Sequence, residues 1–178
     1  MSRLRRTVAL VGMMGAGKSS LGRRLAPLLG VQFRDADSEI EVAAGCSISD
    51  VFERFGEMGF REGERKVIAR LLREPAHVLA TGGGAFIDES TRADIASMAT
   101  SVWLRAPIEL LLTRISRRET RPLLRNGDPR ETMERLLRER ESIYAMADLV
   151  VDSEDGPHQS AIDRLLTALE ARDLLEPP

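Results

Sequence analysis

The sequence predicts an α/β domain in which a five-stranded parallel sheet lies between two layers of helices. Two observations support this prediction. Short runs that are apolar throughout alternate along the chain with longer segments whose apolar residues recur at helical spacing. Strands without a polar face are typical of a parallel sheet that is covered on both sides. The chain has 178 residues and shows no internal repeat or linker, so we expect one domain over residues 1–178.

Five apolar runs are predicted to form the strands. The first covers residues 7–11 and is rich in β-branched and aliphatic side chains. The others are expected at 31–35, 77–81, 101–104 and 149–151. Because ligands bind outside the carboxyl ends of the strands in such sheets, the residues that follow each strand are the candidates for function.

Helical patterns fill most of the segments between these runs. Two helices are expected at 47–55 and 60–72, and a last one covers 162–169. Three others are expected to start after residue 19, after residue 107 and at residue 128. Pro75 stops the helix that is expected to end at residue 72. Asp128, Pro129 and Glu131 supply a cap, a first-turn proline and a capping-box acid for the helix from 128.

Composition and charge exclude several classes of protein. The formal net charge of −2 gives no reason to expect a nucleic acid or a membrane surface as partner. No run of about eighteen apolar residues is present, and the first residues lack the hydrophobic segment of a secretory signal, so we expect a cytoplasmic protein. The single cysteine, Cys46, excludes an internal disulfide and is expected to pack. We expect His77 and His158 to be structural or surface residues, and a monomer is the simplest assembly.

A glycine-rich segment at residues 12–19 has the sequence of a phosphate-binding loop. It fits the pattern G-x-x-x-x-G-K-[ST] at every fixed position and lies between the strand at 7–11 and a helix, as the motif requires. Backbone N–H groups of such a loop point at phosphate oxygens, and the positive end of the helix favours an anion. A glycine-rich turn that binds nothing is the alternative. The residues expected to hold a nucleoside triphosphate are Gly15, Ala16, Gly17, Lys18, Ser19 and Ser20.

Asp35 and Asp37 follow the second expected strand. One carboxylate can face Mg²⁺, which prefers hard oxygen ligands, and the other can take the proton of an attacking hydroxyl group. The alternative is a helix cap, because Asp37 followed by a serine and a glutamate would also start a helix.

Charged residues lie on two predicted helix faces that are otherwise apolar. Arg61 and Glu64 are three residues apart, and Glu64 lies on an apolar stripe. Arg140 shares a face with leucines and Tyr144. A guanidinium on such a face should be held by an anion, and two of them could grip a carboxylate through paired N–H donors. A purely structural ion pair between Arg61 and Glu64 is the alternative.

Three consecutive glycines, Gly82, Gly83 and Gly84, follow the third expected strand. A turn rarely needs three glycines, whereas bare backbone lets a small ligand lie against the chain and bind its N–H groups. The alternative is a flexible loop that precedes a helix.

An arginine-rich region follows the fourth expected strand. Residues 105–140 hold ten arginines and six acids, an excess of four positive charges. The part at about 114–128 has no sustained apolar pattern, so we expect a mobile cationic flap there that orders on phosphates and excludes water. The alternative is a solvated charged loop. Nucleic-acid binding is disfavoured because aromatic residues make up only 4% of the chain.

Taken together, these features resemble the shikimate kinase family. The resemblance runs from about residue 7 to residue 152 and rests on five ordered motifs. They are Gly12–Ser19, Asp35-Ala36-Asp37, Phe60-Arg61-Glu62-Gly63-Glu64, Thr81-Gly82-Gly83-Gly84, and Arg121-Pro122-Leu123-Leu124 with Arg140 and Tyr144 downstream. The resemblance implies a three-layer α/β/α P-loop kinase fold, similar to that of nucleoside monophosphate kinases. It also implies a substrate-binding segment at about 35–64 and a mobile lid at the flap, about 114–128.

The resemblance further implies the reaction and the residues that carry it. The reaction is Mg²⁺-dependent transfer of the ATP γ-phosphoryl group to the 3-hydroxyl of shikimate, a step in chorismate and aromatic amino acid biosynthesis. The catalytic residues would be Lys18, Asp37 and Arg121, and Mg²⁺ would bind Ser19 and Asp35. ATP would contact the phosphate-binding loop, Arg114 and Arg121, and shikimate would contact Asp37, Arg61, Gly82, Gly83, Gly84 and Arg140.

Two other functions stay open at this point. One is a kinase of the same architecture for a sugar acid or a nucleoside monophosphate, although arginines suited to a lone carboxylate argue against a nucleotide acceptor. The other is a nucleotide switch without catalysis. It would not recognise guanine through Asn-Lys-x-Asp, because Asn126 is the only asparagine and no lysine follows it. The chain departs from some relatives in the acidic segment 153–156, where they have a basic residue near the adenine.

Overall fold

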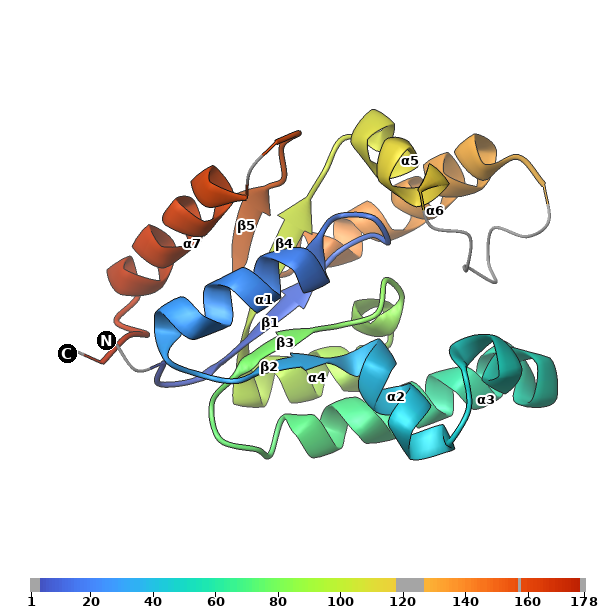
Figure 1. Ribbon diagram of the computed structural model, residues 1–178, viewed down its shortest axis with the longest axis horizontal. Helices are drawn as coiled ribbons and strands as arrows, with labels where there is room; N and C mark the ends of the chain where they lie inside the picture. Colours follow the sequence, from blue (N-terminus) through green and yellow to red (C-terminus); the bar gives the residue numbers. More distant parts are fainter. Residues whose placement is uncertain (1–3, 118–126, 157, 177–178) are drawn as a thin grey trace.

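The computed structural model describes residues 4–117, 127–156 and 158–176. Five strands form one sheet in the order β2-β3-β1-β4-β5, and all neighbouring strands are parallel (Figure 1). The strands are β1 (Thr7–Val11), β2 (Phe33–Asp35), β3 (Val78–Ala80), β4 (Ala99–Arg105) and β5 (Leu149–Asp152). The predicted α/β fold with a five-stranded parallel sheet is confirmed, with strand ends that differ from the prediction by up to two residues.

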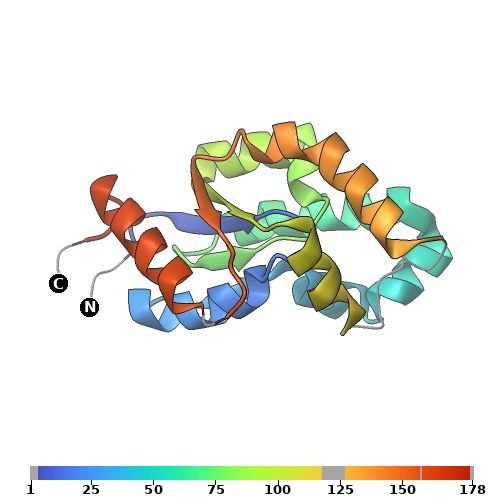
Figure 2. The ribbon, with the colours of Figure 1, turned by 90° about the horizontal axis from the view of Figure 1, so that it is seen from above.

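Helices cover both faces of this sheet. They are α1 (Lys18–Leu29), α2 (Ala36–Ala44), α3 (Ile48–Leu71), the short 3₁₀ helix η1 (Ala85–Ile87), α4 (Glu89–Met98), α5 (Ile108–Ser116), α6 (Pro129–Tyr144) and α7 (Gln159–Ala171). Figure 2 shows α1 and α7 on one side of the sheet and α4 on the other. Within the described ranges, no helix is both long and apolar enough to cross a membrane.

Helices α2 and α4 were expected only as alternatives, the first as a helix that starts near Asp37 and the second as a helix after the three glycines. Each is short and buries little: α2 buries Ala36 and Ile40, and α4 buries Thr91 and Ile95. A helix that buries so few residues gives no clear apolar repeat in the sequence.

The two helices expected at 47–55 and 60–72 form one element, α3, with a kink. The kink is at Gly56, whose φ of 67° and ψ of −176° are not helical. Glycine adopts this backbone without the clash that a Cβ would cause. The C-terminal arm of α3 carries Arg61 and Glu64, so the kink separates the part that reaches the site from the part that joins α2.

The parallel register brings the carboxyl ends of the central strands together. Leu10 of β1 lies opposite Ala80 of β3, and Val11 lies opposite Trp103 of β4. Strand β1 is fully buried along its length. The loops that follow β1, β2 and β3 therefore leave the sheet at one edge, as the sequence predicted.

His77, directly before β3, is 2% exposed, and its Nδ1–H donates to the Pro75 carbonyl at 2.9 Å. Its Nε2 is buried and has no hydrogen-bond partner. Burial lowers the pKa of the His77 imidazole, because a protonated ring would carry an unpaired N–H in the core. The expectation that His77 is structural agrees with this environment.

We expect stability to fall at acidic pH partly because of His77. The unfolded state binds a proton below a pH of about 6.5 and the folded state does not, so the free energy of unfolding should drop by up to about 1.4 kcal/mol per pH unit below that value. The variant His77→Gln should show a smaller loss of stability, measured by urea unfolding between neutral pH and about pH 5.5. Thr167→Val, which changes an exposed residue without a titratable group, is the control, and equal slopes in His77→Gln and wild type would contradict the prediction.

Candidate functional site

The phosphate-binding loop connects β1 to α1 and has the shape of an anion site (Figure 1). Gly17 caps α1 with a φ of 95°, and no side chain caps the first N–H groups of the helix. A Cβ on Gly12, whose φ is 136°, would lie 2.7 Å from the Leu104 carbonyl oxygen. The glycines therefore allow a tight loop whose backbone N–H groups are available to phosphate oxygens.

Lys18 lies across the loop to which it belongs. Its side chain is 8% exposed, and Nζ donates to the carbonyl oxygens of Gly12 at 2.8 Å and Met13 at 2.9 Å. These bonds hold the ammonium group over the centre of the loop, which is where a triphosphate would meet it.

Ser19 and Asp35 are in direct contact. Ser19 Oγ donates to Asp35 Oδ2 at 2.5 Å, while Asp35 Oδ1 accepts from the backbone N–H groups of Asp37 at 3.1 Å and Ser38 at 3.4 Å. The alternative of a helix cap is thus realised, by Asp35 itself. Its second carboxylate oxygen and the Ser19 hydroxyl still form a pair of hard oxygens that suits Mg²⁺.

One cavity gathers most of the predicted residues from these loops. It has a volume of about 580 Å³. Ten predicted residues line it: Gly15, Gly17, Lys18, Ser19, Ser20, Asp35, Asp37, Gly82, Gly83 and Arg114. Among the residues that the structure describes, no group of three or more His, Cys, Asp or Glu could hold a metal ion. An ion here would depend on phosphate and water for the rest of its ligands, as Mg²⁺ commonly does.

Arg61 and Glu64 form a buried ion pair beside this cavity. Arg61 Nη1 donates to Glu64 Oε2 at 2.6 Å, and the Glu64 side chain is 2% exposed. The other oxygen, Glu64 Oε1, is buried and has no hydrogen-bond partner within the part of the chain that the structure describes. Burial raises the pKa of the Glu64 carboxyl, and the guanidinium of Arg61 offsets part of this effect.

Charged side chains crowd around the segment Gly82–Gly84, here called the glycine loop. A Cβ on Gly82 would lie 2.6 Å from Glu64 Oε1 and 3.1 Å from Asp37 Oδ1. A Cβ on Gly84 would lie 2.4 Å from Arg61 Nη2. The bare backbone therefore makes room for the side chains of the protein, in addition to any ligand.

Arg140 reaches the same loop from α6. It is 9% exposed, and Nη1 donates to the Gly83 carbonyl at 3.3 Å. Arg61 and Arg140 thus converge on neighbouring glycines although 79 residues of sequence separate them (140 − 61). Two guanidinium groups around one backbone segment provide donors for a small carboxylate.

Arg114 lies on the outer side of the phosphate-binding loop. Nη1 donates to the Ala16 carbonyl at 3.0 Å and to Ser153 Oγ at 2.9 Å, and Nη2 donates to the Glu154 carbonyl at 2.9 Å. Burial lowers the pKa of this guanidinium. Arg114 therefore links the loop to the acidic segment after β5.

His158 is a cavity residue that sequence reasoning missed, as are Arg23, Ser38 and Arg117. We expected a structural or surface role, but the side chain lines the cavity, and its Cε1 lies 3.3 Å from where a Cβ on Gly17 would be. Burial, together with Arg24 and Arg114, lowers the pKa of its imidazole. No motif marks this histidine, because its position depends on how α7 packs.

Arg121 and most of the expected flap fall within 118–126, outside the described residues. Of the expected flap, residues 114–116 form the end of α5, residue 117 follows it, and residues 127–128 precede α6. The roles predicted for Arg121 and for a mobile flap stay predictions.

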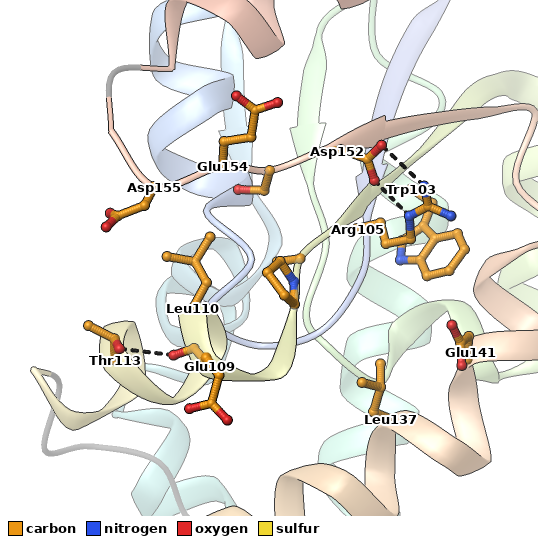
Figure 3. Close-up of a pocket in the computed structure, with 13 residues that line it drawn as sticks. Trp103, Arg105, Glu109, Leu110, Thr113, Leu137, Glu141, Asp152, Glu154 and Asp155 are labelled. Atoms are coloured by element: carbon orange, nitrogen blue, oxygen red, sulfur yellow. Dashed lines mark hydrogen bonds and ion pairs between the residues drawn. The ribbon is translucent and has the colours of Figure 1, made fainter.

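A larger cavity, of about 750 Å³, contains none of the predicted residues (Figure 3). Trp103, Leu110 and Leu137 form part of its apolar wall, and carboxylates surround them. Three of these carboxylates are already paired: Asp152 with Arg105 at 2.7 Å, Glu109 with Arg130 at 2.8 Å, and Glu154 with Arg164 at 2.8 Å. Its acidic rim does not suit a phosphate.

The fold and the first cavity define a P-loop kinase that acts on a small molecule. Comparisons with known proteins agree with this class. A family model described as "Shikimate kinase" matches residues 14–170. The chain belongs to the shikimate kinase family, and it is an ATP-dependent phosphotransferase.

Individual relatives support this assignment over most of the chain. The chain is 58% identical to the shikimate kinase of Paramagnetospirillum magneticum, over 94% of this chain and 86% of that protein. It is 56% identical to that of Caulobacter vibrioides, over 92% and 82%. The solved structure of a shikimate kinase from Acinetobacter baumannii in complex with shikimate matches with a TM-score of 0.91 and 38% identity, over 95% of each chain. A gluconokinase from Sinorhizobium meliloti, at 17% identity and a TM-score of 0.57, shares the fold alone.

We expect Gly82→Ala to disable the acceptor side of the site. The new methyl group would lie within 3.1 Å of both Glu64 Oε1 and Asp37 Oδ1, so these carboxylates must move. Such a displacement should lower kcat/KM for the acceptor by about a hundredfold in a steady-state assay. The control is Gly63→Ala, which meets nothing within 4 Å and should keep full activity. Normal kinetics of Gly82→Ala would show that this crowding has no functional meaning.

Proposed function

We propose that this protein transfers the γ-phosphoryl group of ATP to the 3-hydroxyl of shikimate and forms shikimate 3-phosphate for chorismate and aromatic amino acid biosynthesis. One observation carries the proposal: Arg61 and Arg140 converge on the glycine loop, directly beside the phosphate-binding loop. A carboxylate held there would present the ring of a small acid to the phosphates. The related shikimate kinase from Acinetobacter baumannii was solved in complex with shikimate, which supports this acceptor.

On the donor side, we propose that the backbone of Gly15–Ser20 and the ammonium of Lys18 bind the phosphates. Lys18 already lies over the loop, and its hydrogen bonds to two carbonyl oxygens can be exchanged for bonds to phosphate oxygens. Ser19 and Asp35 would hold Mg²⁺, directly or through water, because their oxygens meet at the entrance of the loop. When bound, Mg²⁺ would neutralise phosphate charge.

On the acceptor side, we propose that Asp37 takes the proton of the reacting hydroxyl. Asp37 lines the phosphate cavity and lies near Gly82, so it stands between the two substrates. Arg61 and Arg140 would bind the carboxylate of the acid, and the N–H groups of Gly82, Gly83 and Gly84 would line its pocket. Glu64 holds Arg61 in place through the ion pair.

The remaining roles rest on the motifs. Arg121, in Arg121-Pro122-Leu123-Leu124 on the flap, would add positive charge to the transferring group. Arg114 would flank the adenine. The proposal takes residues 1–178 as one kinase domain, with an acceptor segment at about 35–64. A monomer suffices, because one chain supplies each of the described groups.

A comparison of acceptors tests the proposal. We expect ADP release, measured in a coupled assay, with shikimate but not with quinate, gluconate or no acceptor, because the reacting hydroxyl must reach Asp37 while the carboxylate is held by Arg61 and Arg140, and this requires the spacing of the two groups in shikimate. The release should require Mg²⁺ and disappear in Lys18→Ala, which serves as the inactive control. Equal release with gluconate or without an acceptor would exclude the proposed substrate.

We also expect the two arginines to act on the acid and not on the nucleotide. Arg61→Ala and Arg140→Ala should each weaken shikimate binding by about tenfold or more in titration calorimetry, because a charged hydrogen bond is lost. The affinity for an ATP analogue should change little. A selective loss of nucleotide binding would refute the assignment of these residues.

A further inference from the structure

Tyr144, the last residue of α6, lies where the two substrate-binding loops meet. Its side chain is 0% exposed. The hydroxyl donates to the carbonyl oxygen of Gly83 in the glycine loop. The same hydroxyl oxygen lies 3.8 Å from Met13 Sδ in the phosphate-binding loop. One buried polar atom therefore contacts both loops.

The two loops also touch each other at this point. A Cβ on Gly83 would lie 3.1 Å from the backbone nitrogen of Met14. No methyl group fits between them without displacing the loop. The distance between Gly83 and the phosphate-binding loop thus sets the spacing between the groups that would bind the acid and those that would bind phosphate.

The ring of Tyr144 is held from behind by β4. Trp103 stacks on it with a distance of 6.0 Å between ring centroids and an angle of 28° between ring planes. Trp103 is opposite Val11 in the sheet and forms part of the wall of the larger cavity (Figure 3). The stacking on a strand of the central sheet therefore fixes the position of the ring that carries the hydroxyl.

Arg140 lies one helical turn before Tyr144 and donates to the same Gly83 carbonyl. This bond, at 3.3 Å, is long for a hydrogen bond from a guanidinium group. The Tyr144 hydroxyl is the shorter donor to that oxygen. Burial raises the pKa of the Tyr144 phenol, so this group remains a donor. Because the carbonyl also accepts from Tyr144, Arg140 can give up its long hydrogen bond and donate to an anion without leaving that oxygen unpaired.

We propose that Tyr144 is a positioning residue for acceptor binding: its hydroxyl fixes the Gly83 carbonyl, and Arg140 can then present its guanidinium to the acceptor carboxylate. Tyr144 does not touch the substrate in this account and acts through Gly83 and Arg140. The inference rests on the proposed function, because it takes Arg140 as a ligand of the acid.

The variant Tyr144→Phe tests this role, because it keeps the stacked ring and removes only the hydroxyl. We expect KM for shikimate to rise by about tenfold, while KM for ATP changes by less than about twofold. The control is Thr113→Val, which removes an exposed hydroxyl that donates to the Glu109 carbonyl on α5 and not to the glycine loop. It should leave KM for both substrates unchanged. A Tyr144→Phe enzyme with unchanged KM for shikimate, or with equal changes for both substrates, would overturn the inference.

A double-mutant cycle tests whether Tyr144 acts through Arg140. In an Arg140→Lys background the planar guanidinium is absent, so Tyr144→Phe should change shikimate affinity by less than about twofold in calorimetry. Full additivity of the two substitutions would show that Tyr144 acts independently of Arg140 and would contradict the inference.

A spectroscopic measurement covers the case in which Tyr144→Phe does not fold. Tyr144 is the only tyrosine of the chain, so incorporation of 3-fluorotyrosine gives one ¹⁹F resonance. We expect this resonance to shift when shikimate is added without nucleotide, and an unchanged resonance at saturating shikimate would overturn the role. If the wild-type protein phosphorylates shikimate but the fluorinated protein shows no such shift, the inference alone is contradicted. Wild-type protein that fails to phosphorylate shikimate contradicts the proposed function itself.

Discussion

The adjacent carboxyl ends of β1 and β3 are the constraint on which the rest of the site depends. Leu10 and Ala80 are partners in the parallel register. Both the backbone N–H and the hydroxyl of Thr81 donate to the Leu10 carbonyl, at 3.1 and 2.9 Å. One carbonyl oxygen thereby fixes where the glycine loop leaves the sheet. Since β1 runs directly into the phosphate-binding loop, the two loops are neighbours before any other side chain takes part.

Charge is then arranged around that junction. Glu64 and Arg61 approach the glycine loop from α3, and the pair is held at 2.6 Å in a buried position. Burying an ion pair costs free energy unless further hydrogen bonds satisfy both groups. Nη1 and Nη2 of Arg61 both lie close to Gly84, and Arg140 lies beside Gly83. A carboxylate at this place would complete the pairing that Glu64 begins, in surroundings where low dielectric strengthens the attraction.

The parts of this arrangement that sequence predicts are those with a local signal. Strands and the phosphate-binding loop are marked by apolar runs and glycine spacing, and Asp35, Asp37 and the glycine loop were found because parallel strands end at one edge. Helix α2 was expected only as an alternative, because Ile40 and one alanine are its buried residues and give no clear apolar repeat. Neither the contact of Tyr144 with Gly83 nor the place of His158 could be predicted. Each depends on how a helix distant in sequence packs against the loops.

The two cavities show that charge, and not size, distinguishes the site. Both lie at the same edge of the sheet, and the larger one is next to the ends of β4 and β5. There Arg105 and Asp152 neutralise each other through two hydrogen bonds, and the remaining rim is acidic. Beside β1, by contrast, Lys18 and the uncapped end of α1 offer positive charge to an anion. Because the acidic rim would repel a triphosphate and the loop beside β1 would attract it, we expect it to bind in the smaller cavity, which is also the one that Asp37 and the glycine loop line.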